Sequence, residues 1–321
     1  MAHLPKNGAL PLRDGVSPSC VALPRLRQCP WPTLLDYLAA RLPRIPRAEW
    51  QARLRAGHVV DDDGRALDEY TPYLHGQRVY YWRTLADEAP VPFQETVLYR
   101  DAHLVVADKP HFLPVTPGGR YVRETLLVRL KRVLDLPDLS PLHRIDRETV
   151  GLVVFSVQAH ERDAYQRLFR ERRVDKTYEA IAPWRDGLRW PLRRTSHLRE
   201  DEKAFFRMRE AAPEEGLPAN SETWIEPLER LDPQAEYARY RLRPVTGKRH
   251  QLRVHMAALG LPIVGDQFYP VVRRGPDEPE DYTQPLQLLA RAIAFDDPIT
   301  GERRVFESLR SLSPSCLQAI S

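Results

Sequence analysis

The sequence is poor in the residues that build disulfide frameworks and metal sites. It has three cysteines, Cys20, Cys29 and Cys316, which are scattered towards its two ends without a Cys-x-x-Cys pair, and its histidines do not cluster. Disulfide scaffolds and zinc sites need such pairs or clusters. We therefore expect no disulfide framework and no bound metal. Isolated thiols of this kind are typical of a reducing compartment, which predicts a cytoplasmic protein.

Long apolar runs are also missing. No run approaches the roughly 20 residues that a membrane-spanning helix needs. The first fifteen residues, MAHLPKNGALPLRDG, have no apolar core of the kind found in secretory signals. There is no glycine-rich phosphate loop either. We expect a chain that neither crosses a membrane nor is secreted, and that uses no nucleotide cofactor.

Positive and negative charges are segregated along the chain. The net charge is +4 and the isoelectric point is about 9.0. Residues 210–236 carry eight acids and one arginine, whereas residues 237–265 carry six lysines or arginines and no acid. A basic run is usually only a solvated face, but this segregation is compatible with a nucleic-acid partner at one face.

The chain is long enough for two domains. Residues 1–30 are rich in proline and predict an irregular arm. Residues 31–88 predict a small module with a helix over 33–43, a second helix that stops at Gly57, a strand over 58–60 and a strand over 76–81. A polar linker over 83–95 follows, with a domain boundary near residue 88. Residues 89–321 show no βαβ rhythm, which predicts an α+β domain with a mixed, largely antiparallel sheet.

The segment PLHRIDRETVGLVVFS, residues 141–156, is the most informative. Leu152 to Phe155 predict a buried strand that begins after Gly151. Asp146 would then stand at the rim of a packed core. An Arg-x-Asp sequence at a strand end is more often a turn with a surface ion pair, so this segment alone does not establish a site.

The order of the motifs along the chain supports a functional interpretation. His143-Arg144-Ile145-Asp146, followed by Thr149 and Gly151, resembles the H-R-L/I-D-x-x-T/S-x-G motif of the RluA-type pseudouridine synthases. Three further segments fit the order of that family, and the resemblance covers about residues 96–301. These segments are Lys109-Pro110 after a strand, Lys176-x-Tyr178 in a strand, and Thr246-Gly247-Lys248-x-His250-Gln251-Leu252-Arg253-x-His255. The chain departs from the family at Phe112, where glycine is common, and at Lys248, where arginine is common.

The resemblance implies a role for each motif residue. Asp146 would be the catalytic carboxylate, acting either as a nucleophile or by removing a ribose proton. Arg253 would pair with it and keep it charged, since burial alone would raise the pKa of a carboxylate. Tyr178 would stack on the target uracil with its hydroxyl placed for proton transfer. Ile145 and Leu252 would form a dry wall of the pocket.

Seven basic or histidine side chains are the candidate RNA contacts. Arg144 would fill the gap left by the flipped base, and for Lys109 a solvated charge is as plausible as a phosphate contact. Thr246 predicts the N-cap of a helix that runs to Leu259, and the free amides at such a helix start would suit a phosphate. The full set is His143, Arg144, Lys109, Lys176, Lys248, Arg249 and His250.

By this resemblance the protein would isomerise uridines in structured RNA to pseudouridine. The reaction is redox-neutral, so we expect no metal and no cofactor. The partner would be a stem-loop of ribosomal or transfer RNA, because flipping a base costs less in a loop than in a duplex. A monomer is the simpler expectation.

Two other functions stay open, as does the role of the N-terminal module. A catalytically silent RNA-binding protein on the same fold would be favoured if a catalytic residue were missing, but Asp146, Tyr178 and Arg253 are all present. A glycosidase would need a second acid, and only Glu148 accompanies Asp146. Residues 31–88 are similar to the S4-type RNA-binding module, although the acids at 61–63 suit RNA poorly. A small helical cap on the main domain is the alternative.

Overall fold

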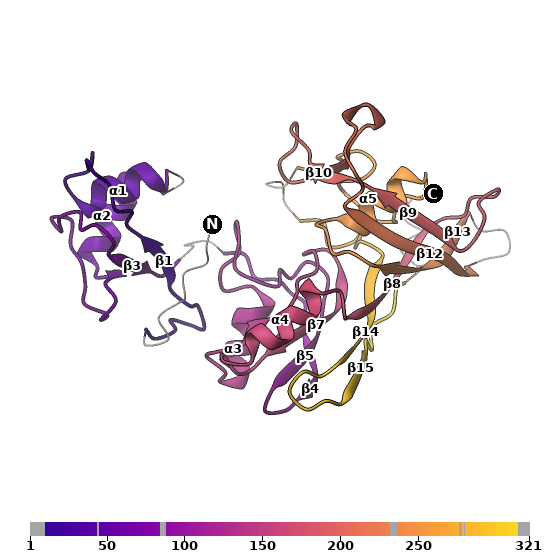
Figure 1. Ribbon diagram of the computed structural model, residues 1–321, viewed down its shortest axis with the longest axis horizontal. Coiled ribbons are helices and arrows are strands. Elements are labelled where there is room, and N and C mark those ends of the chain that lie inside the picture. Colours follow the sequence, from indigo (N-terminus) through magenta and orange to yellow (C-terminus); the bar gives the residue numbers. More distant parts are fainter. Residues whose placement is uncertain are drawn as a thin grey trace. The chain divides into compact units, whose positions relative to one another are not determined.

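The computed structural model describes residues 10–43, 45–83, 88–231, 236–275, 278 and 280–313. The chain divides into two compact units, which Figure 1 draws as ribbons. The smaller unit consists of Met1–Glu88, Pro117–Arg123 and Val128–Asp138, and the larger of Ala89–Thr116, Glu124–Leu127 and Leu139–Ser321. The predicted linker over 83–95 lies partly outside the described residues.

The N-terminal segment of the smaller unit forms two helices and a three-stranded antiparallel sheet in the order β1-β3-β2. Its elements are β1 (Ser19–Ala22), α1 (Leu34–Arg41), α2 (Arg47–Arg55), β2 (Val59–Val60) and β3 (Arg78–Tyr81). The predicted order of two helices and two strands is confirmed. The prediction of an irregular arm over residues 1–30 is wrong for β1, which pairs along its whole length with β3. Resemblance to an S4 module stays a prediction.

The start of α1 shows how local sequence defines these elements. Thr33 forms a capping box with Asp36: the threonine hydroxyl accepts from the Asp36 amide at 3.2 Å, and the Asp36 carboxylate accepts from the Thr33 amide at 3.1 Å. Leu34 and Leu38 on the inner face of α1 pack with Trp50 of α2 in a buried core. Burial of large apolar side chains supplies most of the stability of such short helices.

A ten-stranded sheet forms the larger unit, with the main order β4-β5-β7-β14-β8-β13-β12-β9, while β15 pairs with β14 and β6 with β7. Among the described pairs of this sheet, β7 and β14 run parallel and the rest antiparallel, so the predicted α+β class with a largely antiparallel sheet is confirmed. The strands are β4 (Thr96–Arg100), β5 (Leu104–Lys109), β6 (Ser140–Pro141), β7 (Val150–Ser156), β8 (Asp175–Pro183), β9 (Leu192–Ser196), β12 (Ser221–Arg230), β13 (Tyr237–Pro244), β14 (Leu288–Asp296) and β15 (Arg303–Glu307). A separate hairpin joins β10 (Leu198–Glu200) to β11 (Met208–Glu210).

Two helices of this unit pack on different parts of the sheet. α4 (Arg162–Arg170) buries Tyr165 and Leu168 against β5, β7 and β14. α5 (Gln251–Ala258) buries Leu252 and Met256 against β8, β12 and β13. The remaining helical elements are α3 (Leu126–Leu134), whose residues from Val128 on belong to the smaller unit, and a 3-10 turn at Pro213–Glu215. The turn before β7 and the start of α5 both contribute to the candidate site.

A close backbone contact fixes the start of β7. Gly151 has φ +111°, and a Cβ atom there would lie 2.4 Å from the carbonyl oxygen of Ala290 on β14. Only glycine fits this approach. The Thr149 amide donates to the carbonyl oxygen of Asp146 at 3.2 Å, which closes the turn before the strand. Asp146 is therefore held directly in front of the buried strand β7, as the sequence predicted.

The start of α5 differs from the prediction. The helix begins at Gln251, with His250 as its N-cap residue, and Thr246 is not a cap. The Thr246 hydroxyl instead donates to the side chain of Gln251 at 2.7 Å, and the Lys248 amide donates to the same oxygen at 3.1 Å. The Gln251 side chain thus organises residues 246–250 as a loop, a tertiary feature that a capping rule does not include.

No helix among the described residues is long and apolar enough to cross a membrane. The cytoplasmic location of the protein stays a prediction.

Candidate active site

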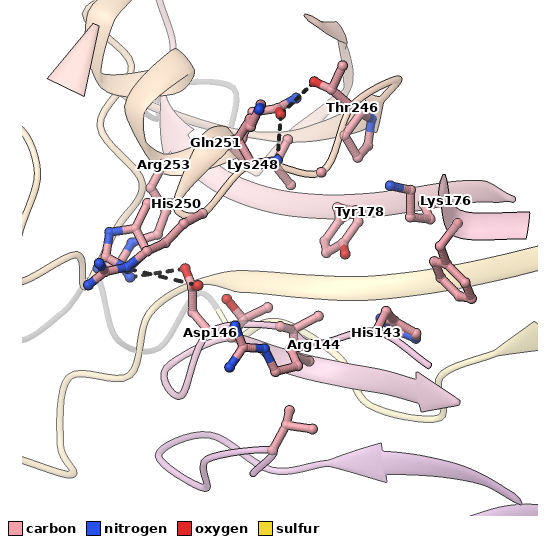
Figure 2. A pocket seen from close by; sticks show the side chains of 18 of the residues that line it. His143, Arg144, Asp146, Lys176, Tyr178, Thr246, Lys248, His250, Gln251 and Arg253 are labelled. Carbon is pink, nitrogen blue, oxygen red and sulfur yellow. Dashed lines mark hydrogen bonds and ion pairs between the residues drawn. The ribbon is translucent and has the colours of Figure 1, made fainter. Parts of the chain in front are cut away.

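A cleft of about 830 Å³ in the larger unit collects almost all the predicted site residues (Figure 2). Its walls come from the turn before β7, from β8 and from the loop that leads into α5. The predicted residues that line it are His143, Arg144, Ile145, Asp146, Lys176, Tyr178, Lys248, Arg249, His250, Leu252 and Arg253. These residues come from three segments, 143–146, 176–178 and 248–253, which are far apart in the sequence, so the fold and not the chain order assembles the cleft.

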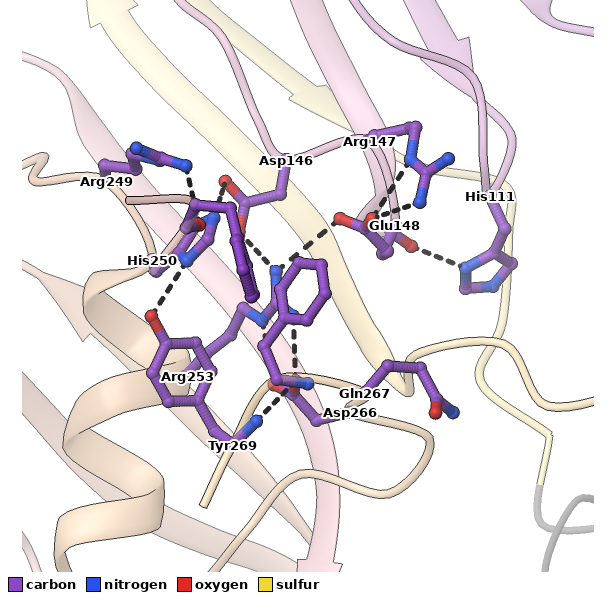
Figure 3. Close-up of polar contacts among 12 residues, drawn as sticks. His111, Asp146, Arg147, Glu148, Arg249, His250, Arg253, Asp266, Gln267 and Tyr269 are labelled. Carbon is purple, nitrogen blue, oxygen red and sulfur yellow. Dashed lines mark hydrogen bonds and ion pairs between the residues drawn. The ribbon is translucent and has the colours of Figure 1, made fainter. Parts of the chain in front are cut away.

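Asp146 and Arg253 form an ion pair at the base of this cleft. The Arg253 Nη1 atom donates to Oδ2 of Asp146 at 3.2 Å (Figure 3). The Arg253 side chain is 1 % exposed and that of Asp146 is 22 % exposed. The carboxylate therefore has a buried cation behind it while part of its surface faces the cleft. This is the pairing that the family resemblance implied.

Asp266 fixes the position of Arg253. The arginine donates from Nε and Nη2 to the two carboxylate oxygens of Asp266 at 2.8 and 2.7 Å. The amides of Phe268 and Tyr269 also donate to Asp266, at 2.9 and 3.1 Å. Burial disfavours the charged guanidinium, but the charge and hydrogen bonds of Asp266 outweigh this effect and raise the pKa of Arg253 well above its usual value. Arg253 is thus a rigid, permanently charged partner for Asp146.

Glu148 also faces Arg253, and it does not line the cleft. Its Oε2 atom lies 3.5 Å from Nη1 of Arg253, and its Oε1 atom accepts from Arg147 at 2.8 Å. Burial alone would raise the pKa of Glu148, but the charges of Arg253 and Arg147 hold it at about 2. Among the described residues that line the cleft, Asp146 is the one carboxylate. A glycosidase with two acids across a substrate is therefore not supported.

Tyr178 lies on β8 and lines the cleft together with Leu252 and Leu288, against which it packs. Burial, and to a lesser degree the charge of Asp146, raises the pKa of Tyr178 above its usual value. The hydroxyl is therefore protonated at neutral pH. An aromatic face and a protonated hydroxyl in one cleft suit a flat base that exchanges a proton.

The cations of the cleft differ in what they can bind. Arg144 is exposed, and no described residue lies within ion-pairing or hydrogen-bonding distance of its guanidinium. Burial, and to a lesser degree the charge of Arg172, lowers the pKa of Lys176. Lys248 is exposed, while Arg249 donates to the carbonyl oxygens of Phe205 and Phe206 at 3.3 and 2.6 Å. Arg144, Lys176 and Lys248 are thus the better placed for phosphate groups.

The comparisons with known proteins agree with this geometry. Residues 103–258 match the family model described as RNA pseudouridylate synthase. The chain is 34 % identical over 238 residues to an uncharacterized RNA pseudouridine synthase of Synechocystis sp., covering 74 % of this chain and 79 % of that protein. It is 32 % identical over 223 residues to the dual-specificity RNA pseudouridine synthase RluA of Escherichia coli strain K12, covering 66 % and 91 %. The chain belongs to the RluA-type RNA pseudouridine synthases.

Solved structures show that the fold of this RNA pseudouridine synthase is also that of the family. Human RNA pseudouridylate synthase domain containing 1 superposes with a TM-score of 0.56 at 24 % identity, covering 70 % of this chain and 86 % of that one. Human RNA pseudouridylate synthase domain containing 4 gives a TM-score of 0.50 at 25 % identity, covering 70 % and 91 %. The protein is accordingly an isomerase that acts on RNA.

One predicted RNA contact of this synthase is wrong. Lys109 is fully buried and does not line the cleft. Its ammonium donates to the carbonyl oxygens of Pro110 and Arg147, both at 2.9 Å. Burial lowers the pKa of Lys109 to about 7. The residue supports the turn after Asp146 from beneath, because a buried backbone carbonyl needs a donor, and it is not available to RNA.

Neither predicted histidine brings a positive charge to the cleft. His143 accepts the Val154 amide through Nε2 at 3.2 Å and stacks on Phe169, and burial lowers its pKa to about 3. Burial likewise lowers the pKa of His250 to about 4. Both rings line the cleft as neutral groups at neutral pH. Their contact with RNA stays a prediction, but it is not that of a cation with a phosphate.

The sequence interpretation missed Asp266, Arg147 and Tyr269. Asp266 had a signal, because it is the first acid after the acid-free run of residues 237–265. The first acid after a segment that carries six basic residues and no acid can be expected to pair with one of them. Arg147 pairs with its neighbour Glu148 and accepts from Lys109 through its carbonyl oxygen, while Tyr269 contacts His250 and Met208; no sequence pattern pointed to either residue.

Proposed function

We propose that Asp146 is the catalytic carboxylate with which this synthase converts uridine to pseudouridine in structured RNA. The observation that carries the proposal is the meeting of Asp146, Arg253 and Tyr178 at one cleft, together with the position of Asp146 as the one carboxylate among its described lining residues. The reaction breaks the bond from C1′ of the ribose to N1 of uracil and forms a bond from C1′ to C5. The proton lost from C5 is balanced by one gained at N1.

Asp146 would start the reaction as an ionised carboxylate. It either attacks the nucleoside or removes a ribose proton, and both routes require the charged form. Arg253 binds the carboxylate through the hydrogen bond to Oδ2, and the two hydrogen bonds from Arg253 to Asp266 hold the arginine in place. Asp146 remains partly open to the cleft, so it can reach a substrate atom without losing its partner.

Tyr178 would serve the detached uracil. Its ring offers a stacking face, and its protonated hydroxyl can exchange a proton at the base. Ile145 and Leu252 add apolar wall to the same cleft. Water has to be excluded at this stage, because attack by water on the ribose would leave an abasic site and not pseudouridine.

RNA would approach through the cationic part of the cleft. The target base has to leave its stack, which favours loops over duplexes. Arg144 is exposed and has no ion-pair or hydrogen-bond partner among the described residues, so it can fill the space that the base vacates. Lys176 and Lys248 would contact the flanking phosphates. We infer a stem-loop of ribosomal or transfer RNA as the substrate and a monomer as the active form.

The experiment compares Asp146→Asn with the wild type on transcripts of ribosomal and transfer RNA loops. We expect Asp146→Asn to form no pseudouridine while its RNA affinity stays within about threefold, because the amide is isosteric but cannot act as a base. Asp163→Asn, an exposed acid on α4 that pairs with Arg170, is the matched control and should behave as the wild type. Turnover by Asp146→Asn would refute the assignment. A wild type that binds these RNAs and modifies none would support a silent RNA-binding protein.

A further inference from the structure

The two oxygens of the Asp146 carboxylate face different partners. Arg253 donates to Oδ2, whereas Oδ1 faces the imidazole of His250, whose Nε2 lies 3.9 Å away. His250 is 8 % exposed and belongs to the wall of the cleft. At 3.9 Å the ring makes no direct hydrogen bond to Oδ1, so the proton or lone pair that it presents acts on the orientation of the carboxylate through charge.

The other ring nitrogen of His250 faces the Tyr269 hydroxyl. The Tyr269 hydroxyl lies 2.9 Å from Nδ1 of His250 and is itself buried (Figure 3). It accepts the amide proton of Met208 on β11 at 2.8 Å, and the Met208 carbonyl oxygen lies 3.1 Å away. With one proton to give, the hydroxyl donates either to Met208 or to His250.

The charge of Asp146 selects between these two arrangements. If Tyr269 donated to Met208, Nδ1 of His250 would keep its proton and Nε2 would turn a lone pair towards the Asp146 carboxylate. If Tyr269 donates to Nδ1, Nε2 carries the proton and presents N–H to Oδ1, which is favourable beside an anion. Because burial keeps His250 neutral at neutral pH, one of the two tautomers has to be chosen.

His250 is held in an uncommon backbone conformation for this contact. Its φ is +54°, which a residue with a side chain rarely adopts. The ring is kept in place by the stacked Phe268 ring, with centroids 6.1 Å apart, and by the edge of Tyr269 at 5.7 Å. Strained residues that persist in folded proteins gather at functional sites. The strain here aims an imidazole at Asp146.

We propose that Tyr269 and His250 form a positioning relay, in which the Tyr269 hydroxyl fixes the Nε2–H tautomer of His250 and that N–H orients Oδ1 of Asp146 while Arg253 holds Oδ2. The inference rests on the proposed role of Asp146. Neither Tyr269 nor His250 is assigned a step in bond making or breaking. The Met208 backbone on β11 anchors the relay at its far end.

The test begins with Tyr269→Phe, which removes the hydroxyl and keeps the ring. We expect the single-turnover rate to fall about tenfold, as for other partners that fix a histidine tautomer, with RNA affinity within twofold of the wild type. Tyr240→Phe is the matched control, because Tyr240 is buried as Tyr269 is. The hydroxyl of Tyr240 donates to the backbone carbonyl oxygen of Pro183 at 2.9 Å. The Tyr240→Phe variant should keep the wild-type rate.

A spectroscopic readout separates the relay from general structural damage. Nitrogen-15 NMR reports which imidazole nitrogen carries the proton, and the His250 signals are those lost in His250→Asn. We expect Nε2–H with unprotonated Nδ1 in the wild type and in Tyr240→Phe, and a mixture of tautomers in Tyr269→Phe. An unchanged tautomer together with an unchanged rate in Tyr269→Phe would overturn the relay.

Variants of His250 supply a second test should Tyr269→Phe fold poorly. Asparagine tolerates the left-handed backbone and can donate N–H, so His250→Asn should be several-fold faster than His250→Ala. Equal rates for these two variants contradict the relay. Asp146→Asn separates failure of the proposed function from failure of the relay. If Asp146→Asn stays active, the proposed function fails. If Asp146→Asn is inactive and Tyr269→Phe has the rate and the tautomer of the wild type, the relay alone is overturned.

Discussion

Replacing Arg253 by lysine tests the buried ion pair most sharply, because lysine keeps the charge and removes the planar fork. Arg253 makes three hydrogen bonds to carboxylates, two to Asp266 and one to Asp146. A single ammonium on a flexible stem cannot occupy all three positions. Arg253→Lys should therefore retain one of the two carboxylate partners and leave the other less well paired.

The size of the effect follows from burial. Hydrogen bonds to charged groups are worth about 1.5–3 kcal/mol each, and breaking a buried ion pair completely costs about 3–5 kcal/mol. Arg253 and Asp266 are both 1 % exposed, so water cannot replace the lost contacts. We expect the free energy of unfolding to fall by about 3 kcal/mol. We also expect turnover to fall about 100-fold, which is what an error of about 1 Å in the position of a catalytic group costs.

Urea denaturation and single-turnover formation of pseudouridine measure the two effects. Arg249→Lys is the matched control, since Arg249 is an exposed neighbour whose hydrogen bonds within the described part of the chain go to backbone carbonyl oxygens. It should change the free energy of unfolding by no more than about 0.5 kcal/mol. An Arg253→Lys protein with the stability and rate of the wild type would refute the view that a fixed guanidinium fork holds Asp146.

Three further predictions concern neighbouring residues. Tyr178→Phe should bind RNA as the wild type does but turn over about 100-fold more slowly, because the loss of one proton-transfer group costs at least this much; unchanged turnover would show that the hydroxyl is not used. Glu148 has a folded pKa of about 2 against an ordinary 4.5, so its stabilising effect is complete above about pH 4.5 and is lost as the pH falls towards 2. The advantage of the wild type over Glu148→Gln in free energy of unfolding should therefore shrink by about 3 kcal/mol between pH 5 and pH 2, and a constant difference across that range contradicts the assignment. Arg144→Ala should weaken RNA binding about tenfold and reduce the slope of log affinity against log salt concentration by about one, without changing the melting temperature. An affinity for RNA equal to that of the wild type would exclude Arg144 from the RNA interface.

The sequence predicted the parts of the site that lie on regular elements. Strand β7 follows from the apolar run after Gly151, and strand β8 from the alternation around Tyr178. Because the position of a strand fixes the direction of its neighbouring turn, the sequence alone places Asp146 at the front edge of β7. The pairing of Asp146 with Arg253 came from the family resemblance, and the hydrogen bond at 3.2 Å agrees with it.

Local rules failed where a partner distant in sequence determines the outcome. Lys109 follows a strand and precedes a proline, a position typical of a surface charge, yet it is buried because the carbonyl oxygen of Arg147 needs a donor. Thr246 has the residue type of an N-cap, but its hydroxyl donates to the side chain of Gln251, and the helix begins later, with His250 as the N-cap residue. The sequence also could not show that His143 and His250 are neutral, since their pKa values depend on burial.

The central claim is that Asp146 carries out the isomerisation in RNA. The most direct measurement compares pseudouridine maps of total RNA from cells that lack the protein and are complemented either with the wild type or with Asp146→Asn at equal expression. We predict that one or a few uridines in loops of ribosomal or transfer RNA carry pseudouridine with the wild type and remain uridine with Asp146→Asn. Identical maps in which those sites are modified by both proteins would contradict the claim.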